Sequence, residues 1–270
     1  MPSPTPAPPP FVVAEGEQGR LLMAGTPQET PLYVFGSGRP GTILMVLGGV
    51  HGNEPAGWLA AERLVDSMRP TDGAVLVIPR ANRQADAAFV RTTIELGDLN
   101  RSYPGARDGR PMEQMAFEII DVLREFQVSH VVDMHESWAF YADRPQNGTA
   151  YLGQTIATDP GSPGQDLARG VVESVNSRVL YPHEEFFFRE RGGNANNQPN
   201  QGFTNPNPNP NPPNPLMTGI GQSSLGLPRF VPGMITSLLV EMGQQQALER
   251  RIALLVEVIT EVSRRVGIAS

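Results

Sequence analysis

Short apolar runs alternate with longer amphipathic windows along most of the chain, and this alternation restricts the possible folds more than any other feature of the sequence. The runs have the length and the β-branched content of buried strands, and the windows carry apolar residues at helical spacing. Predicted strands cover 32–35, 43–47, 74–78, 129–134 and 235–240, and predicted helices cover 54–68, 114–127, 165–178 and 245–266. We therefore expect an α/β fold, with a mixed, largely parallel sheet sandwiched between helices in a single domain.

Two proline-rich segments fall outside this pattern. The first is 1–10, MPSPTPAPPP, which we interpret as a disordered arm. The second contains NPNPNPNPPNP, where alternating proline removes backbone donors and excludes both helix and strand. We expect it to form a long Asn/Pro-rich loop, at about 192–221, inserted into one domain that covers 11–270.

Charge and composition exclude several classes of function. The chain has 21 basic and 28 acidic residues and a net charge of −7, so it lacks the basic surface of a nucleic-acid-binding protein. Cysteine is absent, which excludes disulfides, thiolate catalysis and cysteine-based metal sites. All the basic residues are arginine, so no lysine is present to form a Schiff base.

The sequence lacks the features of membrane and secreted proteins, and we use this to predict where the protein is located. The longest apolar run, 43–50, is too short to cross a bilayer, so we expect no membrane partner. The first residues lack the positive and apolar regions of a secretory signal, and together with the absence of cysteine this favours a cytoplasmic protein. The sequence leaves the oligomeric state open.

His51 and Glu54 lie three residues apart in HGNE, directly after a predicted strand and at the start of a predicted helix. At that spacing both side chains can face one point, as zinc ligands must. The alternative is a polar helix start, with Glu54 near the positive end of the helix dipole and His51 exposed. A dinucleotide site is a weaker alternative, because this glycine-rich turn lacks the G-x-G-x-x-G spacing.

His135 follows the predicted strand 129–134, at the edge where open α/β sheets collect their functional residues. It could supply a third ligand and leave a fourth position for water, which is the arrangement of catalytic zinc. Asp133, two residues earlier on the same face of the strand, could orient a metal-bound imidazole. The alternatives are a loop histidine and a carboxylate that caps the strand end.

Two other motifs carry residues suited to substrate binding and proton transfer. Arg101 in GDLNR presents a fork that suits a carboxylate, and Asn100 adds a neutral donor, although a surface loop with a salt-bridged arginine is an alternative. Glu241 follows three apolar residues in LLVEMG. Desolvation there would raise the pKa of its carboxyl towards the range of a general base. The alternative is a carboxylate that caps the last helix.

Four segments, taken together and in this order, resemble the zinc carboxypeptidase superfamily, and within it the succinylglutamate desuccinylase/aspartoacylase family. The segments are GGVHGNEPAG (48–57), GDLNRSYPG (97–105), VVDMHES (131–137) and LLVEMG (238–243). The resemblance implies one Zn²⁺ per chain, and the ligands that it implies are His51, Glu54 and His135. It further implies that Glu241 is the catalytic base.

The same resemblance assigns roles towards the substrate. It implies that Asn100 and Arg101 bind a substrate carboxylate and that Arg91 polarises the scissile carbonyl. The aromatic side chain that peptidases of this superfamily bring over the substrate has only loose candidates here, which are Tyr141, Tyr151 and Phe230.

The expected function is therefore zinc-dependent hydrolysis of an amide bond adjacent to a free carboxylate, with the zinc-bound water activated by a glutamate base. The substrate would be a small molecule, an N-acyl amino acid. Alternatively, the protein would be a metallocarboxypeptidase acting on short peptides. A second alternative, from another class of function, is a non-catalytic zinc- or ligand-binding module whose Asn/Pro-rich loop docks a partner.

Overall fold

The structure is a computed structural model that describes residues 11–144, 151–159, 163–190, 222–231 and 235–268. The predicted arm at 1–10 and the predicted loop at 192–221 lie outside the described residues.

One sheet organises the described part of the chain. It has eight strands in the order β1-β2-β4-β3-β5-β10-β8-β9. The strands are β1 (Gly16–Leu22), β2 (Thr30–Gly36), β3 (Ile43–Leu47), β4 (Ala74–Ile78), β5 (His130–Ser137), β8 (Thr155–Thr158), β9 (Phe187–Glu190) and β10 (Thr236–Gly243). The central run β4-β3-β5-β10 is parallel, and antiparallel pairs join β2 to β4 and β8 to β10. The predicted α/β fold with a mixed, largely parallel sheet is confirmed.

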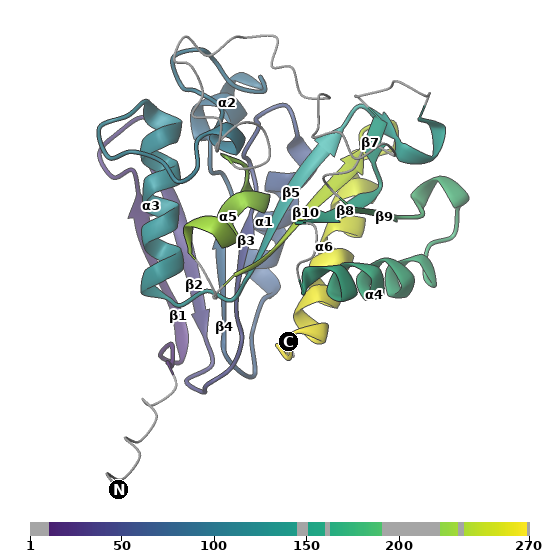
Figure 1. The fold of residues 1–270 in the computed structure, drawn as a ribbon, viewed down its shortest axis with the longest axis horizontal. Coiled ribbons are helices and arrows are strands. Elements are labelled where there is room, and N and C mark those ends of the chain that lie inside the picture. Colours follow the sequence, from purple (N-terminus) through teal and green to yellow (C-terminus); the bar gives the residue numbers. More distant parts are fainter. Residues whose placement is uncertain (1–10, 145–150, 160–162, 191–221, 232–234, 269–270) are drawn as a thin grey trace, which may run out of the picture.

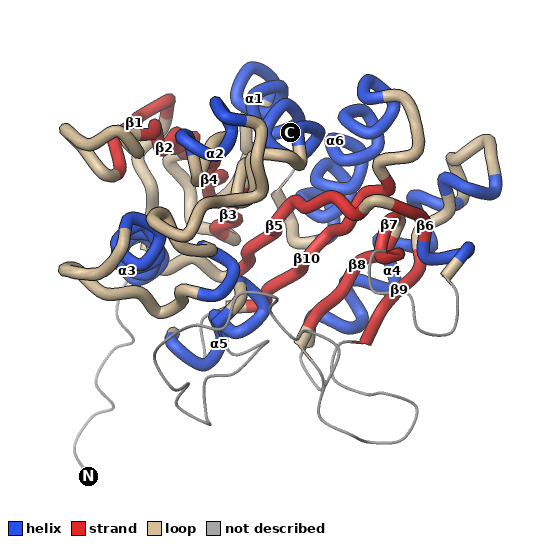
Figure 2. Tube along the Cα trace, turned by 90° about the horizontal axis from the view of Figure 1, so that it is seen from above, coloured by secondary structure: helices blue, strands red, loops and turns tan. Residues whose placement is uncertain are grey.

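Helices cover both faces of this sheet, as Figures 1 and 2 show. The longer helices are α1 (Pro55–Ser67), α3 (Pro111–Glu125), α4 (Gly164–Asn176) and α6 (Leu248–Arg265), and the short ones are α2 (Arg83–Ala88) and α5 (Leu227–Phe230). α1, α4 and α6 pack on one face, and α3 and α5 pack on the other. Two short strands, β6 (Ala139–Phe140) and β7 (Tyr151–Gly153), form a separate parallel pair.

Strand β5 shows how the sheet divides the core into two layers. Val131 belongs to the layer under α3, whereas Val132 and Met134 belong to the layer under α1 and α6. Side chains alternate along a strand, so Asp133 and His135 point to the same face as Val131. Between Val131 and His135 the central strand is therefore apolar on the face under α1 and α6 and carries two polar groups on the other face.

Two predicted strands end later than the sequence indicates. β5 continues past Met134 to Ser137, and β10 continues past Val240 to Gly243. The two strands pair in parallel over their last residues, with Glu241 opposite His135. Backbone pairing keeps these polar residues in the ladder even though hydrophobic patterning ends before them. His135 thus lies within a strand and not just beyond one.

Strands β1, β8 and β9 were not among those predicted. β1 has the sequence GEQGRLL and is almost fully exposed, so it carries no hydrophobic signal. β8 and β9 contain only four residues each. Within the residues that the structure describes, no helix is both long enough and apolar enough to cross a membrane.

Candidate functional site

Three potential ligands come from the loop after strand β3, the start of helix α1 and the neighbouring parallel strand β5. His51 lies in the loop after β3, Glu54 is the N-cap residue of α1, and His135 lies on β5 beside β3. The loop can pass close to α2 because residue 52 is glycine. A Cβ atom at Gly52 would lie 2.0 Å from the backbone of Ala85, so any other residue would push the loop away.

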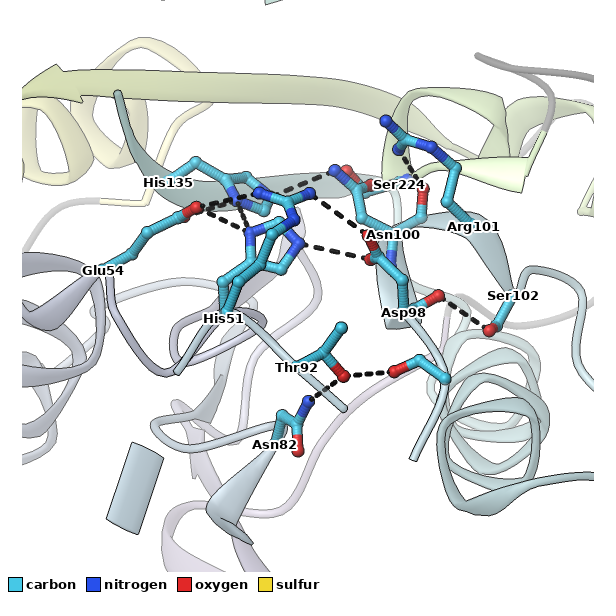
Figure 3. A network of polar contacts seen from close by, with 12 residues as sticks. His51, Glu54, Asn82, Thr92, Asp98, Asn100, Arg101, Ser102, His135 and Ser224 are labelled. Carbon is cyan, nitrogen blue, oxygen red and sulfur yellow. Dashed lines mark hydrogen bonds and ion pairs between the residues drawn. The ribbon is translucent and has the colours of Figure 1, made fainter. Parts of the chain in front are cut away.

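The ligand atoms of these three residues converge, as Figure 3 shows. His51 Nδ1 lies 2.7 Å from Glu54 Oε1, and His135 Nδ1 lies 2.8 Å from Glu54 Oε2. One ligand atom from each of the three residues can be chosen so that all lie within 4.8 Å of one another, and all three side chains are buried. The predicted grouping of His51, Glu54 and His135 is therefore present in the structure.

Charge interactions within this cluster are strong. Burial alone would raise the pKa of Glu54, but His51 and His135 outweigh burial and hold the pKa well below its usual range. Burial lowers the pKa of His135, and this effect is overcome by Asp133 and Glu54, which raise it well above its usual range. The buried carboxylate of Glu54 is therefore stable only with positive charge beside it, which protons on the histidines or a metal ion can supply.

Each histidine is also held from its outer side by a carboxylate. His135 Nε2 lies 2.9 Å from Asp133 Oδ2, and His51 Nε2 lies 3.2 Å from Asp98 Oδ1. A carboxylate on the outer nitrogen fixes the tautomer so that the inner nitrogen presents its lone pair to a metal ion. Asp133 was predicted for this position. Asp98 was missed, although it stands two residues before Asn100 in the GDLNR segment.

The donor set fits one metal ion. Two imidazole nitrogens and one carboxylate oxygen are the ligands of many catalytic zinc sites, which leave a fourth position open. A buried carboxylate between two imidazoles, each oriented by a further carboxylate, matches the support that such ligands need. His51, Glu54 and His135 can therefore hold one metal ion.

A cavity of about 370 Å³ opens beside these ligands. Its lining includes all the residues predicted for the site, which are His51, Glu54, Arg91, Asn100, Arg101, His135 and Glu241. Glu241 pairs with His135 across the β5–β10 ladder, so the two side chains leave the sheet on the same face. Glu241 is half-buried, not fully enclosed by the apolar residues before it.

The predicted arginines and Asn100 also contact the cluster. Arg91 donates to Glu54 Oε1 over 3.4 Å and to Asp98 Oδ2 over 3.2 Å. Asn100 lies between His135 and Arg101 in Figure 3, with its Nδ2 3.5 Å from His135 Nε2. Arg101 Nη1 donates to the Asn100 carbonyl over 2.6 Å, which holds the guanidinium at the wall of the cavity.

The three aromatic candidates do not line this cavity. Phe230 packs against the core, and the Tyr141 ring lies tilted beside Phe187 with ring centres 5.7 Å apart. The cavity instead has Trp138 in its wall, with 63% of the residue exposed. Trp138 comes directly after the VVDMHES segment, and its position at the end of β5 was the signal that could have identified it.

A second cavity, of about 520 Å³, lies between β2, β4 and α1 and contains none of the predicted site residues. It is larger than the cavity at the ligands. Size therefore does not identify the functional site in this protein, and the convergence of chemically suited side chains does.

Comparison with known proteins agrees with this geometry. The succinylglutamate desuccinylase/aspartoacylase catalytic domain family matches residues 40–139, the segment that contains all three potential ligands. This segment is similar to the catalytic domain of that family, and solved structures named for the family share the fold of the chain at 18% and 19% identity. This family lies in the zinc carboxypeptidase-like superfamily, so the resemblance seen in the sequence is confirmed.

One curated relative of this chain is an N-alpha-acetyl-L-2,4-diaminobutyric acid deacetylase from Halomonas elongata. The two are 36% identical over 108 residues, which is 39% of this chain. The chain spans 31% of the length of that deacetylase.

Solved structures share the fold of this chain at low sequence identity. A succinylglutamate desuccinylase/aspartoacylase from Rhodobacter sphaeroides has a TM-score of 0.63 and 18% identity, over 95% of this chain and 67% of that one. The ectoine utilization protein EutE (DoeB) from Ruegeria pomeroyi has a TM-score of 0.58 and 16% identity, over 99% and 70%. The cell shape determinant Csd4 from Helicobacter pylori has a TM-score of 0.66 and 17% identity, over 84% and 51%.

Proposed function

We propose that this protein is a zinc-dependent hydrolase that cleaves an amide bond adjacent to a free carboxylate, as a deacylase of N-acyl amino acids. The convergence of His51, Glu54 and His135 beside a cavity that also contains Glu241 carries this proposal. The similarity of part of the chain to a deacetylase of an N-acetylated amino acid supports the substrate class.

In this proposal His51, Glu54 and His135 hold zinc. When bound, zinc supplies a Lewis acid and lowers the pKa of a water molecule to about 7. Asp98 and Asp133 keep the inner nitrogens of the two histidines directed at the metal position.

Glu241 acts as the proton carrier. It takes a proton from the attacking water and delivers it to the leaving amine, so one carboxylate serves first as base and then as acid. Its position opposite His135 in the parallel ladder sets it on the metal side of the sheet. The half-buried environment leaves it in contact with the cavity.

Asn100, Arg101 and Arg91 act on the substrate. Arg101 binds its carboxylate through the guanidinium, and Asn100 adds an amide donor. Arg91 polarises the scissile carbonyl, and its contacts with Glu54 and Asp98 hold it next to the metal ligands. These groups fix the amide in register with Glu241, which removes the entropy cost of alignment from the chemical step.

The experiment that tests this proposal combines metal analysis with turnover. Purified protein would be assayed on N-acetyl-L-2,4-diaminobutyrate, N-acetylaspartate, N-succinylglutamate and short peptides, before and after treatment with a chelator and after readdition of zinc. We expect zinc-dependent release of the free amine from at least one N-acyl amino acid.

Two results would replace the proposal with an alternative. Faster cleavage of peptides than of N-acyl amino acids would indicate a metallocarboxypeptidase. Stoichiometric zinc with no turnover of either class, under conditions where the fold is intact, would indicate a non-catalytic binding module.

A further inference from the structure

Arg189 lies on the same face of the sheet as the proposed base. Leu239 of β10 pairs with Ala157 of β8, and Ala157 pairs with Arg189 of β9. Side chains of paired residues leave a sheet on the same side, so Arg189 shares a face with Leu239 and with Glu241, two residues further along β10. Both Leu239 and Glu241 line the cavity at the metal ligands.

The neighbouring residue on β9 confirms this orientation. Phe188 packs in the opposite layer, under α4 and α6, and the guanidinium carbon of Arg169 lies 4.0 Å from the centre of its ring. Because side chains alternate along a strand, Arg189 points away from that layer, to the face of the sheet that carries Glu241, and its position is just beyond the residues that line the cavity. Two strand spacings of about 4.8 Å separate β9 from β10, a gap that the long arginine side chain can cross.

The guanidinium of Arg189 has a donor available to bind an anion. Its Nε is buried and has no hydrogen-bond partner in the described part of the chain. Burial lowers the pKa of Arg189 and Arg144 adds to this effect, whereas Glu241 and Tyr141 act against it. A buried N–H donor without an acceptor destabilises the protein, and a carboxylate oxygen would satisfy it with a charge-assisted bond.

We propose that Arg189 determines specificity by binding a second carboxylate of the substrate, at the end remote from Asn100. This inference rests on the proposed amide hydrolysis. Asn100 lies beside His135 on β5, whereas Arg189 lies on β9, which is three strands along the sheet. Glu241 stands between them on β10. The two carboxylates therefore lie on opposite sides of the scissile amide, and the preferred substrate is a dianion.

Matched substrate pairs test this assignment. One pair is the N-succinyl and N-butyryl derivatives of the same amino acid, which differ in the terminal carboxylate of the acyl group. The other pair is N-acetylaspartate and N-acetyl-α-aminobutyrate, which differ in a carboxylate of the amino acid. The proteins compared are the wild type, Arg189→Gln, Arg189→Lys and the control Arg169→Gln, which changes an arginine of α4 that packs over Phe188 on the opposite face of β9.

We expect Arg189→Gln to lower kcat/KM at least about tenfold for the N-succinyl derivative, mainly through KM, and less than about threefold for its N-butyryl partner. Arg189→Lys should recover part of the loss because it retains the charge, and Arg169→Gln should change neither substrate. The N-acetylaspartate pair is the control for position, because both carboxylates of N-acetylaspartate lie on the amino acid side of the scissile amide, and we expect its two members to respond alike. A selective loss confined to the N-acetylaspartate pair, equal losses within both pairs, or no loss in either, would overturn the proposal.

A binding measurement separates this inference from the proposed function. If the zinc-loaded wild type hydrolyses none of these amides, the proposed function fails, and calorimetry with glutarate and butyrate still reports on Arg189. Weaker binding of glutarate by Arg189→Gln, with unchanged binding of butyrate, would support the second carboxylate position. Equal affinity of the wild type for both acids would refute it.

Discussion

The Nδ1 atoms of His51 and His135 lie 3.1 Å apart, although 84 residues separate the two histidines in the chain. Two imidazoles turned towards each other in a buried setting cannot both carry a proton on the facing nitrogens without strong repulsion. The carboxylate of Glu54 contacts both rings and is stabilised by positive charge. A divalent cation at the centre would bind the carboxylate and accept a lone pair from each imidazole.

The first prediction is that the purified protein holds about one zinc per chain and that His51→Ala and His135→Ala each lose it. Metal content measured by plasma mass spectrometry checks this. The matched control is His130→Ala, because His130 lies on the same strand but bonds to Ser129 and not to the cluster. Full zinc occupancy in the double variant of His51 and His135 would show that the metal site is assigned wrongly.

The second prediction is that Glu241→Gln keeps its zinc and its melting temperature but loses at least about 10²-fold in kcat, because the base transfers protons and does not coordinate the metal. Single-turnover rates together with metal analysis measure both properties. Glu249→Gln is the control, since Glu249 is exposed and pairs with Arg63 away from the cavity. Loss of zinc from Glu241→Gln would make Glu241 a ligand.

The third prediction concerns the carboxylate behind His51. Asp98→Asn removes the acceptor that orients the imidazole, so zinc affinity should fall about 10- to 100-fold while the ligands themselves remain. Competition with a zinc-binding dye measures this change. Asp108→Asn, at an exposed position of the next loop, should leave zinc affinity unchanged. An affinity for zinc equal to that of the wild type would mean that Asp98 serves only to bind Arg91 and the backbone N–H of Asn100.

The fourth prediction is that Arg101→Met strongly lowers kcat/KM for substrates with a free α-carboxylate and lowers it much less for the corresponding uncharged amides. A guanidinium that binds a carboxylate makes a charge-assisted contact, and breaking it costs several kcal/mol, typically about 2–5. Parallel assays of each acid and its amide measure the difference. Equal slowing of both would reduce Arg101 to a structural role at the Asn100 carbonyl.

The fifth prediction concerns the pH dependence of stability. Burial raises the pKa of Asp86 to about 7, and its two carboxylate oxygens have no hydrogen-bond partner in the described part of the chain. The folded state therefore binds this proton more tightly than the unfolded state. Its contribution to stability is complete below about pH 4 and is lost as the pH rises through about 7.

Asp86→Asn removes this titration. The variant should gain stability over the wild type at about pH 8, by up to about 4 kcal/mol, and the difference should shrink towards about pH 4. Urea unfolding at both pH values measures it, with the exposed Asp108→Asn as control. A variant that is less stable than the wild type at the higher pH would show that the carboxylate of Asp86 is stabilising when ionised.

The sequence predicted the central strands and the four long helices because their signals are local. β3 and β4 occupy the predicted residues, since five consecutive apolar side chains buried on both faces leave no other interpretation. β8 and β9 were not predictable in this way. Each is four residues long, and their pairing depends on where β10 lies, which no short window contains.

The residues of the site also divide into those that local sequence predicts and those that depend on contacts between distant parts of the chain. Asp133 and His135 are two residues apart on β5, so the period of a strand brings both to one face. His51 and Glu54 are three apart, and the turn between them, in which the Glu54 N–H donates to the His51 carbonyl, is also local. The contact of Asp98 with His51 spans 47 residues and depends on how a loop packs. The direction in which Arg189 points depends on a register carried through two neighbouring strands. Neither relationship leaves a pattern in the local sequence.

The order of the strands makes the backbone of β5, on one side of the site, harder to change than that of β9, on the other side. β5 is paired on both of its edges, to β3 and to β10, whereas β9 is paired only to β8 in the described sheet. A change in the backbone of β5 disturbs the hydrogen bonds to two neighbouring strands and moves His135, the proposed metal ligand. A change in the edge strand β9 disturbs the hydrogen bonds to β8 alone in the described sheet. If the proposed function and the proposed role of Arg189 hold, changes in β9 would alter the preferred substrate and leave the hydrolytic site intact, so this edge of the sheet is the place to redesign specificity.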